Sequence, residues 1–157
     1  MKKKGPATRD YFAEMYVAGM MADRGWNVYF PVRDIGFDFI ATIKVGNNTI
    51  IRPIQVKGKY PTASVLNKNG YGYMGKLSQL HPEMILVIPY FSLKIETHPA
   101  CVAYIPHSQI RENRNKSGQM RCLPAKLIDG RPEPRRDFKK FFDQSGLQLA
   151  ATADFNL

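Results

Sequence analysis

The first part of the chain has the apolar spacing of an amphipathic helix. Apolar or small residues recur at intervals of four and three positions, at Phe12, Tyr16 and Gly19, which is the repeat of one helical face. Gly25 follows, and glycine easily adopts the left-handed conformation in which many helices end. The pattern therefore predicts a helix over residues 6–24.

The next stretch contains three segments with the composition of β-strands. Aromatic and β-branched residues are dense in residues 26–32, 37–43 and 49–57, and such residues favour extended, pleated structure. The Gly-Asn-Asn sequence at 46–48 is typical of a tight hairpin turn, so the second and third strands should be neighbours. Pro31 places the first strand at an edge or a bend.

The second half of the chain alternates apolar segments with irregular ones. We expect a loop at 58–75, a short helix at 76–80, strands at 84–88 and 101–105, an irregular basic region at 111–134 and a final helix at 136–144. The order α-β-β-β-α-β predicts an α/β (α+β) fold with one mixed sheet. It should form a single domain over 1–157, with a basic C-terminal extension over 107–140.

Composition and charge narrow the class of protein. The chain has 157 residues, of which 44% are hydrophobic, so it can fill the core of one domain. Its formal charge of +10 favours a polyanionic partner, with nucleic acid first and an anionic membrane surface second. The longest apolar stretch, residues 84–91, is too short to span a bilayer, and no signal-peptide pattern is seen. We therefore expect a cytoplasmic, intracellular protein associated with DNA rather than a membrane protein.

Candidate chemistry lies on the second and third strands. Alternate side chains of a strand face opposite sides, so Gln55 and Lys57 should project together while their apolar neighbours enter the core. Asp38 lies between two phenylalanines and should point to the same side across the hairpin. A carboxylate, an amide oxygen and an ammonium group brought together suit phosphodiester hydrolysis with Mg²⁺.

This arrangement resembles the PD-(D/E)XK, or restriction endonuclease-like, nuclease superfamily. The resemblance spans residues 8–106 and rests on Gly36-Phe37-Asp38 followed, across one hairpin, by Ile54-Gln55-Val56-Lys57. The upstream helix, which carries Ala13-Glu14, is similar to the acidic first motif of that superfamily. Small Holliday-junction resolvases and homing or restriction-type endonucleases are the nearest in character.

The resemblance implies both an activity and residue roles. Asp38 would be the central metal ligand, Gln55 would take the Asp/Glu position and Lys57 would be the catalytic lysine. Glu14 would supply a further ligand or orient a metal-bound water. The family implies cleavage of DNA that depends on Mg²⁺, with Mn²⁺ as a substitute, by a homodimer or larger homo-oligomer.

Gln55 departs from the family pattern and leaves a second hypothesis open. The pattern prefers Asp or Glu at this position, and a neutral amide oxygen binds Mg²⁺ less tightly than a carboxylate. The alternative is therefore a catalytically inactive module of the same fold that binds DNA or RNA. A third hypothesis is a basic surface that docks an acidic protein partner.

Basic and aromatic residues in two regions are candidates for DNA contact. Rings can pack on sugars or bases while lysine and arginine meet phosphates. The first region lies between the third and fourth predicted strands, and the second lies in the basic extension. The candidates are Lys68, Tyr71, Tyr73, Lys76, Arg111, Arg114, Lys116 and Arg121.

The remaining reactive residue types give weaker signals. Asp34 is a second candidate ligand because of its closeness to Asp38, and His107 is the histidine nearest the predicted core strands. Cys101 lies in an apolar strand, which predicts a packed thiol, and Cys122 has no adjacent base that could activate it as a nucleophile.

Overall fold

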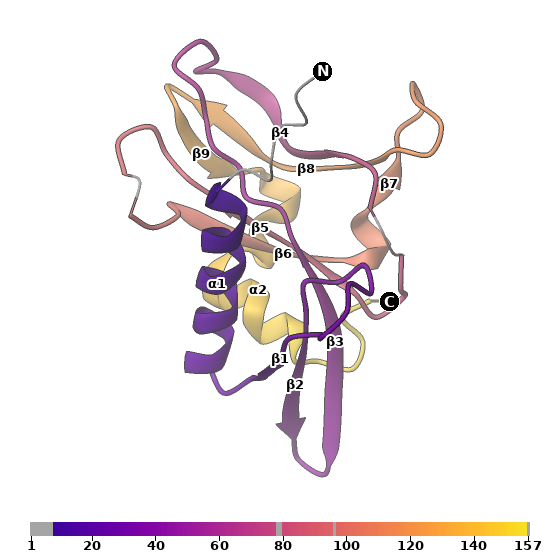
Figure 1. The fold of residues 1–157 in the computed structure, drawn as a ribbon. Helices are drawn as coiled ribbons and strands as arrows, with labels where there is room; N and C mark the ends of the chain where they lie inside the picture. The colour runs from indigo at the N-terminus through magenta and orange to yellow at the C-terminus, as the bar shows by residue number, and fades with distance from the viewer. Residues whose placement is uncertain (1–7, 78–79, 96, 157) are drawn as a thin grey trace.

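A computed structural model describes residues 8–77, 80–95 and 97–156 of the chain (Figure 1). Two helices, two short 3₁₀ segments and nine strands lie within these ranges. They are α1 (Thr8–Asp23), β1 (Asn27–Tyr29), β2 (Phe39–Val45), β3 (Asn48–Val56), β4 (Lys68–Gly75), β5 (Ile85–Tyr90), β6 (Cys101–Pro106), η1 (His107–Gln109), β7 (Arg111–Glu112), β8 (Met120–Ile128), β9 (Arg131–Pro134), η2 (Arg136–Phe141) and α2 (Asp143–Ala150).

The main sheet is mixed, as the sequence predicts. Its strand order is β1-β2-β3-β5-β6. Strands β3 and β5 are parallel, with Ile54 opposite Ile85, and the other neighbouring pairs are antiparallel. The hairpin expected at 46–48 joins β2 to β3, with Gly46 at φ +61° and Val45 opposite Asn48. The protein is thus a mixed α+β structure with a mixed multistranded sheet.

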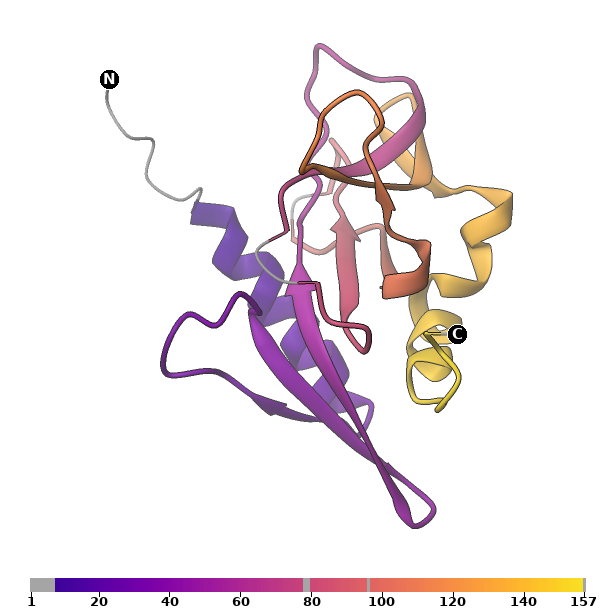
Figure 2. The ribbon, with the colours of Figure 1, turned by 90° about the vertical axis from the view of Figure 1, so that its right-hand side faces the viewer.

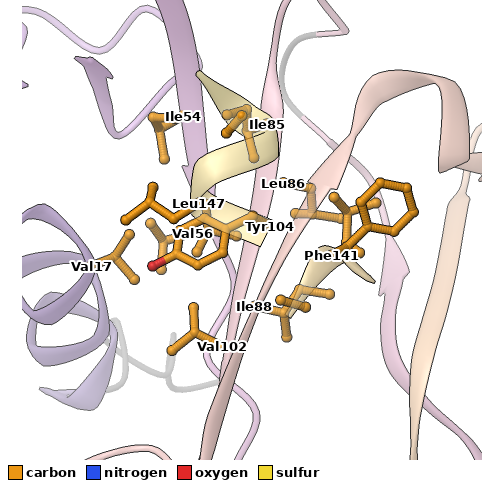
Figure 3. Packing of buried hydrophobic residues seen from close by; sticks show 14 of the residues in the cluster. Val17, Ile54, Val56, Ile85, Leu86, Ile88, Val102, Tyr104, Phe141 and Leu147 are labelled. Carbon is orange, nitrogen blue, oxygen red and sulfur yellow. The ribbon is translucent and has the colours of Figure 1, made fainter. Parts of the chain in front are cut away.

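Both helices cover one face of this sheet. Ile54 and Val56 point to the same face as Tyr104 and Val102, and Val17 of α1 lies on that side (Figure 3). Helix α1 ends at Asp23, one residue before the predicted end, and Gly25 follows in the left-handed region at φ +92°. Residues 6 and 7 of the predicted helix lie outside the described residues.

A buried arginine attaches α2 and the C-terminal segment to the same face. The Arg52 guanidinium is 1% exposed, pairs with Glu83, and donates hydrogen bonds to the carbonyls of Ala150 at 3.1 Å and Thr152 at 2.6 Å. It also lies 5.5 Å from the centre of the Phe155 ring. Burial lowers the pKa of Arg52, and Glu83 opposes that shift. These contacts fix β3, the strand that carries Gln55.

A second sheet, which the sequence pattern does not predict, covers the opposite face. Strands β4, β8 and β7 are neighbours in this sheet, and β9 pairs with β8 (Figures 1 and 2). Tyr71 of β4 packs on Tyr90 of β5 at 5.5 Å between ring centres, and the Tyr90 hydroxyl donates to the Tyr71 carbonyl at 2.9 Å. The main sheet is therefore a middle layer between helices and a second sheet.

Two predictions in the second half of the chain are wrong for this reason. The expected loop at 58–75 ends in β4, and the expected irregular region at 111–134 contains β7, β8 and β9. Strand β4 pairs with β8, which is far away in sequence, and its glycine content locally disfavours a strand. Strands β7 and β9 pair with β8 across short connections. Part of the helix expected at 76–80 lies outside the described residues, and Lys76, Leu77 and Leu80 are not helical.

The last predicted helix is divided into two elements. Residues 136–141 form η2, and α2 begins at Asp143, whose φ of +53° reverses the chain direction. Phe141 and Phe142 are buried, as expected for the inner side of this segment, and Phe138 is half-buried. None of the helices in the described ranges is long and apolar enough to cross a membrane.

Candidate active site at the end of strand β3

A polar cavity opens where β3 ends. Its volume is about 320 Å³, and it holds three of the four predicted catalytic residues. Helix α1, the residue before β2, the end of β3 with the residues that follow it, and strand β4 each contribute to its wall. The lining residues are Glu14, Asp38, Val56, Lys57, Gly58, Lys59, Tyr73 and Met74.

Asp38 is held against β3 by both its main chain and its side chain. It directly precedes β2, rather than lying within the strand as the sequence reading placed it. Its N–H donates to the Ile54 carbonyl at 2.9 Å, and its Oδ2 accepts the Val56 N–H at 2.6 Å. One carboxylate oxygen is thus used for positioning, while the group has acceptor capacity remaining toward the cavity.

Lys57 directly follows β3, and a main-chain hydrogen bond to the main sheet fixes its position. Its N–H donates to the Val87 carbonyl at 2.9 Å, which extends the parallel pairing of β3 and β5 by one residue. Its ammonium nitrogen lies 5.5 Å from the centre of the Tyr73 ring, within reach of a cation–π contact. The second sheet therefore helps to hold the lysine at the cavity.

Glu14 reaches the cavity from α1. Ala13 and Val17 are buried, and their four-residue spacing places this stripe of the helix against the sheet. Glu14 is half-buried beside that stripe. A Cβ on Gly58 would lie only 3.2 Å from the Ala13 Cβ, so the glycine lets α1 approach the end of β3 closely.

Gln55 differs in position from the other three. It is 3% exposed and does not line the cavity. The sequence pattern correctly places its neighbours Ile54 and Val56 in the core, but the second sheet covers the face that Gln55 occupies. Its role as a ligand stays a prediction.

Lys59 is a cavity residue that the sequence reading missed. It continues the alternation of Gln55 and Lys57, and this spacing was a usable signal. Its N–H donates to the Pro89 carbonyl at 2.9 Å, and its ammonium nitrogen lies 5.2 Å from the centre of the Tyr71 ring. Burial, and secondarily the charge of Lys68, lowers the pKa of Lys59.

The donor set suits Mg²⁺ bound together with a substrate phosphate. In the part of the chain that the structure describes, no three His, Cys, Asp or Glu side chains form a metal-ligating group. Two carboxylates, those of Asp38 and Glu14, do line one cavity. Mg²⁺ commonly takes one or two carboxylates, with substrate phosphates and water completing its shell, so these two residues fit that mode.

The predicted DNA-contact residues divide into exposed and buried groups. Tyr73 is half-buried in the cavity wall, and burial raises the pKa of its hydroxyl. Tyr71 is 6% exposed and lies between the two sheets, and its contact with DNA stays a prediction. The remaining candidates are all exposed: Lys68, Lys76, Arg111, Arg114, Lys116 and Arg121.

Other reactive residues have structural positions away from the cavity. The Asp34 Oδ1 accepts the Gly36 N–H at 2.9 Å within a bend, and neither Asp34 nor His107 lines the cavity. Cys101 and Cys122 are buried, as predicted for the first, and burial raises the pKa of each thiol to about 12. Neither thiol is a candidate nucleophile.

Comparison of the chain with models of known protein families gives no match, and comparison with the curated proteins gives none either.

Proposed function

We propose that the protein is a metal-dependent DNA endonuclease with a restriction endonuclease-like core, acting at the cavity of Asp38, Glu14 and Lys57. The observation that carries this proposal is the meeting of these three side chains, distant in sequence, in one polar cavity. Helix α1 and the antiparallel strands β1, β2 and β3 precede β5, which is parallel to β3, and this part of the core supports the proposal. In the described residues, strand β4 rather than the expected helix lies between β3 and β5.

Each of the cavity side chains has a separate role in the proposed reaction. Asp38 and Glu14 would hold Mg²⁺, which supplies electrostatic polarisation of the scissile phosphate when bound. Lys57, steadied by the Tyr73 ring, offsets the negative charge that develops on the phosphate during attack. Lys59 adds a second cation to the same wall and attracts the substrate backbone. In a cavity partly shielded from water these charges act more strongly than on an open surface.

The first test is cleavage of plasmid and four-way-junction DNA in Mg²⁺, Mn²⁺ or EDTA. Asp38→Asn keeps an oxygen able to accept the Val56 N–H, and Lys57→Met keeps the apolar stem of the lysine, so both variants should fold. We expect each to lose cleavage by at least about a hundredfold while DNA affinity stays close to that of the wild type.

Lys44→Met is the matched control, because Lys44 is an exposed lysine of β2 that does not line the cavity. It should cleave like the wild type. Cleavage by Asp38→Asn or Lys57→Met at the wild-type rate would remove the assignment, and so would wild-type cleavage that continues in EDTA.

A catalytically inactive nucleic-acid-binding module is the second candidate. The observation in its favour is Gln55, which is neutral and buried away from the cavity. This candidate predicts salt-sensitive binding, no metal requirement and no products on any substrate. New cleavage in Gln55→Glu, with an inert wild type, would select it over the endonuclease.

A further inference from the structure

A second, larger cavity lies on the other side of strand β8 from β4. Its volume is about 720 Å³, and four arginines line it against one carboxylate, that of Glu112. It opens along the edge of β8 between the short strand β7 and strand β9, which pair with different parts of β8. The arginines are Arg111, Arg114, Arg121 and Arg135.

Two of these arginines face each other directly. Arg111 and Arg121 are register partners in the antiparallel pair of β7 and β8, so their side chains leave the same face of the sheet. Like charges directly opposite one another destabilise a strand pair. Among the residues that the structure describes, no carboxylate lies within ion-pair distance of any of the four guanidinium groups. The four guanidinium groups are therefore not paired with a carboxylate, although Glu112 lines the same cavity.

The third arginine is held in place by the protein. Arg135 Nη1 donates to the Leu123 carbonyl at 2.9 Å, and its guanidinium lies 5.8 Å from the centre of the Phe138 ring. Leu123 and Phe138 also line the cavity. This guanidinium is oriented before any ligand arrives, which lowers the entropic cost of binding an anion.

We propose that this arginine cavity binds the phosphodiester backbone of a nucleic-acid strand and leads that strand to the candidate active site. Guanidinium groups bind phosphate oxygens through paired hydrogen bonds, and several separate cations along one cavity suit a repeating anion better than a single ion. The shared chemistry of DNA and RNA backbones is what the cavity would recognise.

The position of the cavity connects it to the active site. Arg121 is the register partner of Met74, and Cys122 is the register partner of Tyr73. Met74 and Tyr73 line the active-site cavity, while Arg121 and Cys122 line the arginine cavity. Partners in an antiparallel pair have Cβ atoms about 5 Å apart, so the two cavities adjoin across one strand pair. The proposal that the arginine cavity leads a strand to the active site rests on the proposed function. The proposal that the arginines bind a phosphodiester backbone does not.

The test is fluorescence anisotropy with labelled single-stranded DNA, duplex DNA and RNA, in a background of Asp38→Asn that prevents cleavage. The test variant is Arg111→Gln with Arg121→Gln. We expect affinity to fall about tenfold or more, and the slope of log affinity against log salt to become shallower by about two, since two phosphate contacts are lost. Single-site Arg114→Gln, on the loop after β7, should weaken binding without touching the strand pair.

The matched control is Arg24→Gln with Lys44→Gln, which removes the same charge from exposed positions that line neither cavity. Thermal unfolding of the test variant should occur at or above the temperature of its parent, because a repulsive pair is removed. Equal affinity of the test and control variants would overturn the arginine assignment, as would preferential binding of polyglutamate over every oligonucleotide. Wild-type protein that binds through the arginines but cuts nothing would instead contradict the proposed endonuclease.

Discussion

The position of Asp38 is not defined by the alternation of side chains along a strand alone. The alternation of Ile54 to Lys57 correctly predicts which side chains of β3 are buried in the helix-covered face. It does not predict that Asp38 lies outside β2, where its carboxylate accepts the Val56 N–H. That hydrogen bond joins β2 and β3 at the cavity, and it depends on main-chain geometry that a residue pattern does not contain.

Gln55 shows that the burial of a residue can depend on segments far away in sequence. The sequence around β3 predicts that its polar side is exposed to solvent, because no residue pattern near β3 indicates a second sheet. In the structure this face is covered and Gln55 is buried. Segments far apart in sequence decide whether Gln55 is buried, so its burial could not be predicted from the residues around it.

The two buried thiols predict how stability depends on pH. Burial raises the pKa of Cys101 and Cys122 to about 12 in the folded protein, from an ordinary value of 9.0. Between these values the unfolded chain releases the thiol protons while the folded chain retains them, so stability falls as pH rises. Each thiol contributes a slope of up to about 1.4 kcal/mol per pH unit.

Urea unfolding at a series of pH values above 8 measures this slope. We expect Cys101→Ala with Cys122→Ala to flatten the alkaline fall in stability relative to the wild type. Tyr11→Phe is the control, since Tyr11 is 64% exposed and should leave the slope unchanged. An identical alkaline profile for the cysteine variant would show that the thiols are not buried as described.

At the level of elements, β4 is the strand that completes the active-site cavity. Its Gly- and Tyr-rich sequence predicts a loop, since glycine is depleted in strands. The structure gives the physical reason for one of these glycines. A Cβ on Gly72 would lie 2.2 Å from the Cys122 carbonyl oxygen and 2.8 Å from Pro124 Cδ. Glycine there allows β4 and β8 to approach, and it therefore supports the strand rather than opposing it.

Gly72→Ala should consequently separate β4 from β8. We expect the free energy of unfolding to fall by about 2 kcal/mol or more, as for other overpacked positions, and DNA binding to weaken because both cavities share this strand pair. Gly19→Ala is the matched control, since a Cβ on Gly19 meets nothing within 4 Å and α1 should gain roughly 0.5–1 kcal/mol. Chemical denaturation of both variants measures the contrast, and equal loss of stability in the two would contradict the described packing.

Across the whole molecule, the excess positive charge is concentrated in particular regions rather than spread uniformly. Composition alone predicts a polyanionic partner, and the basic C-terminal region was identified from its charge density. The sequence could not show that β8 of this region pairs with β4, or that Arg121 lies opposite Met74 in the wall of the cavity of Asp38 and Lys57. That adjacency arises from long-range pairing, and it turns a basic extension into part of one surface.

The most direct measurement is a Mn²⁺ titration followed by amide NMR spectra, because it locates a divalent cation residue by residue and needs no knowledge of the preferred DNA. We expect the amide signals of Glu14, Asp38, Val56 and Lys57 to broaden first, and Asp38→Asn to abolish this selective broadening while the rest of the spectrum is retained. Selective broadening at another site, or the same broadening in wild type and Asp38→Asn, would contradict a metal-dependent active site in this cavity.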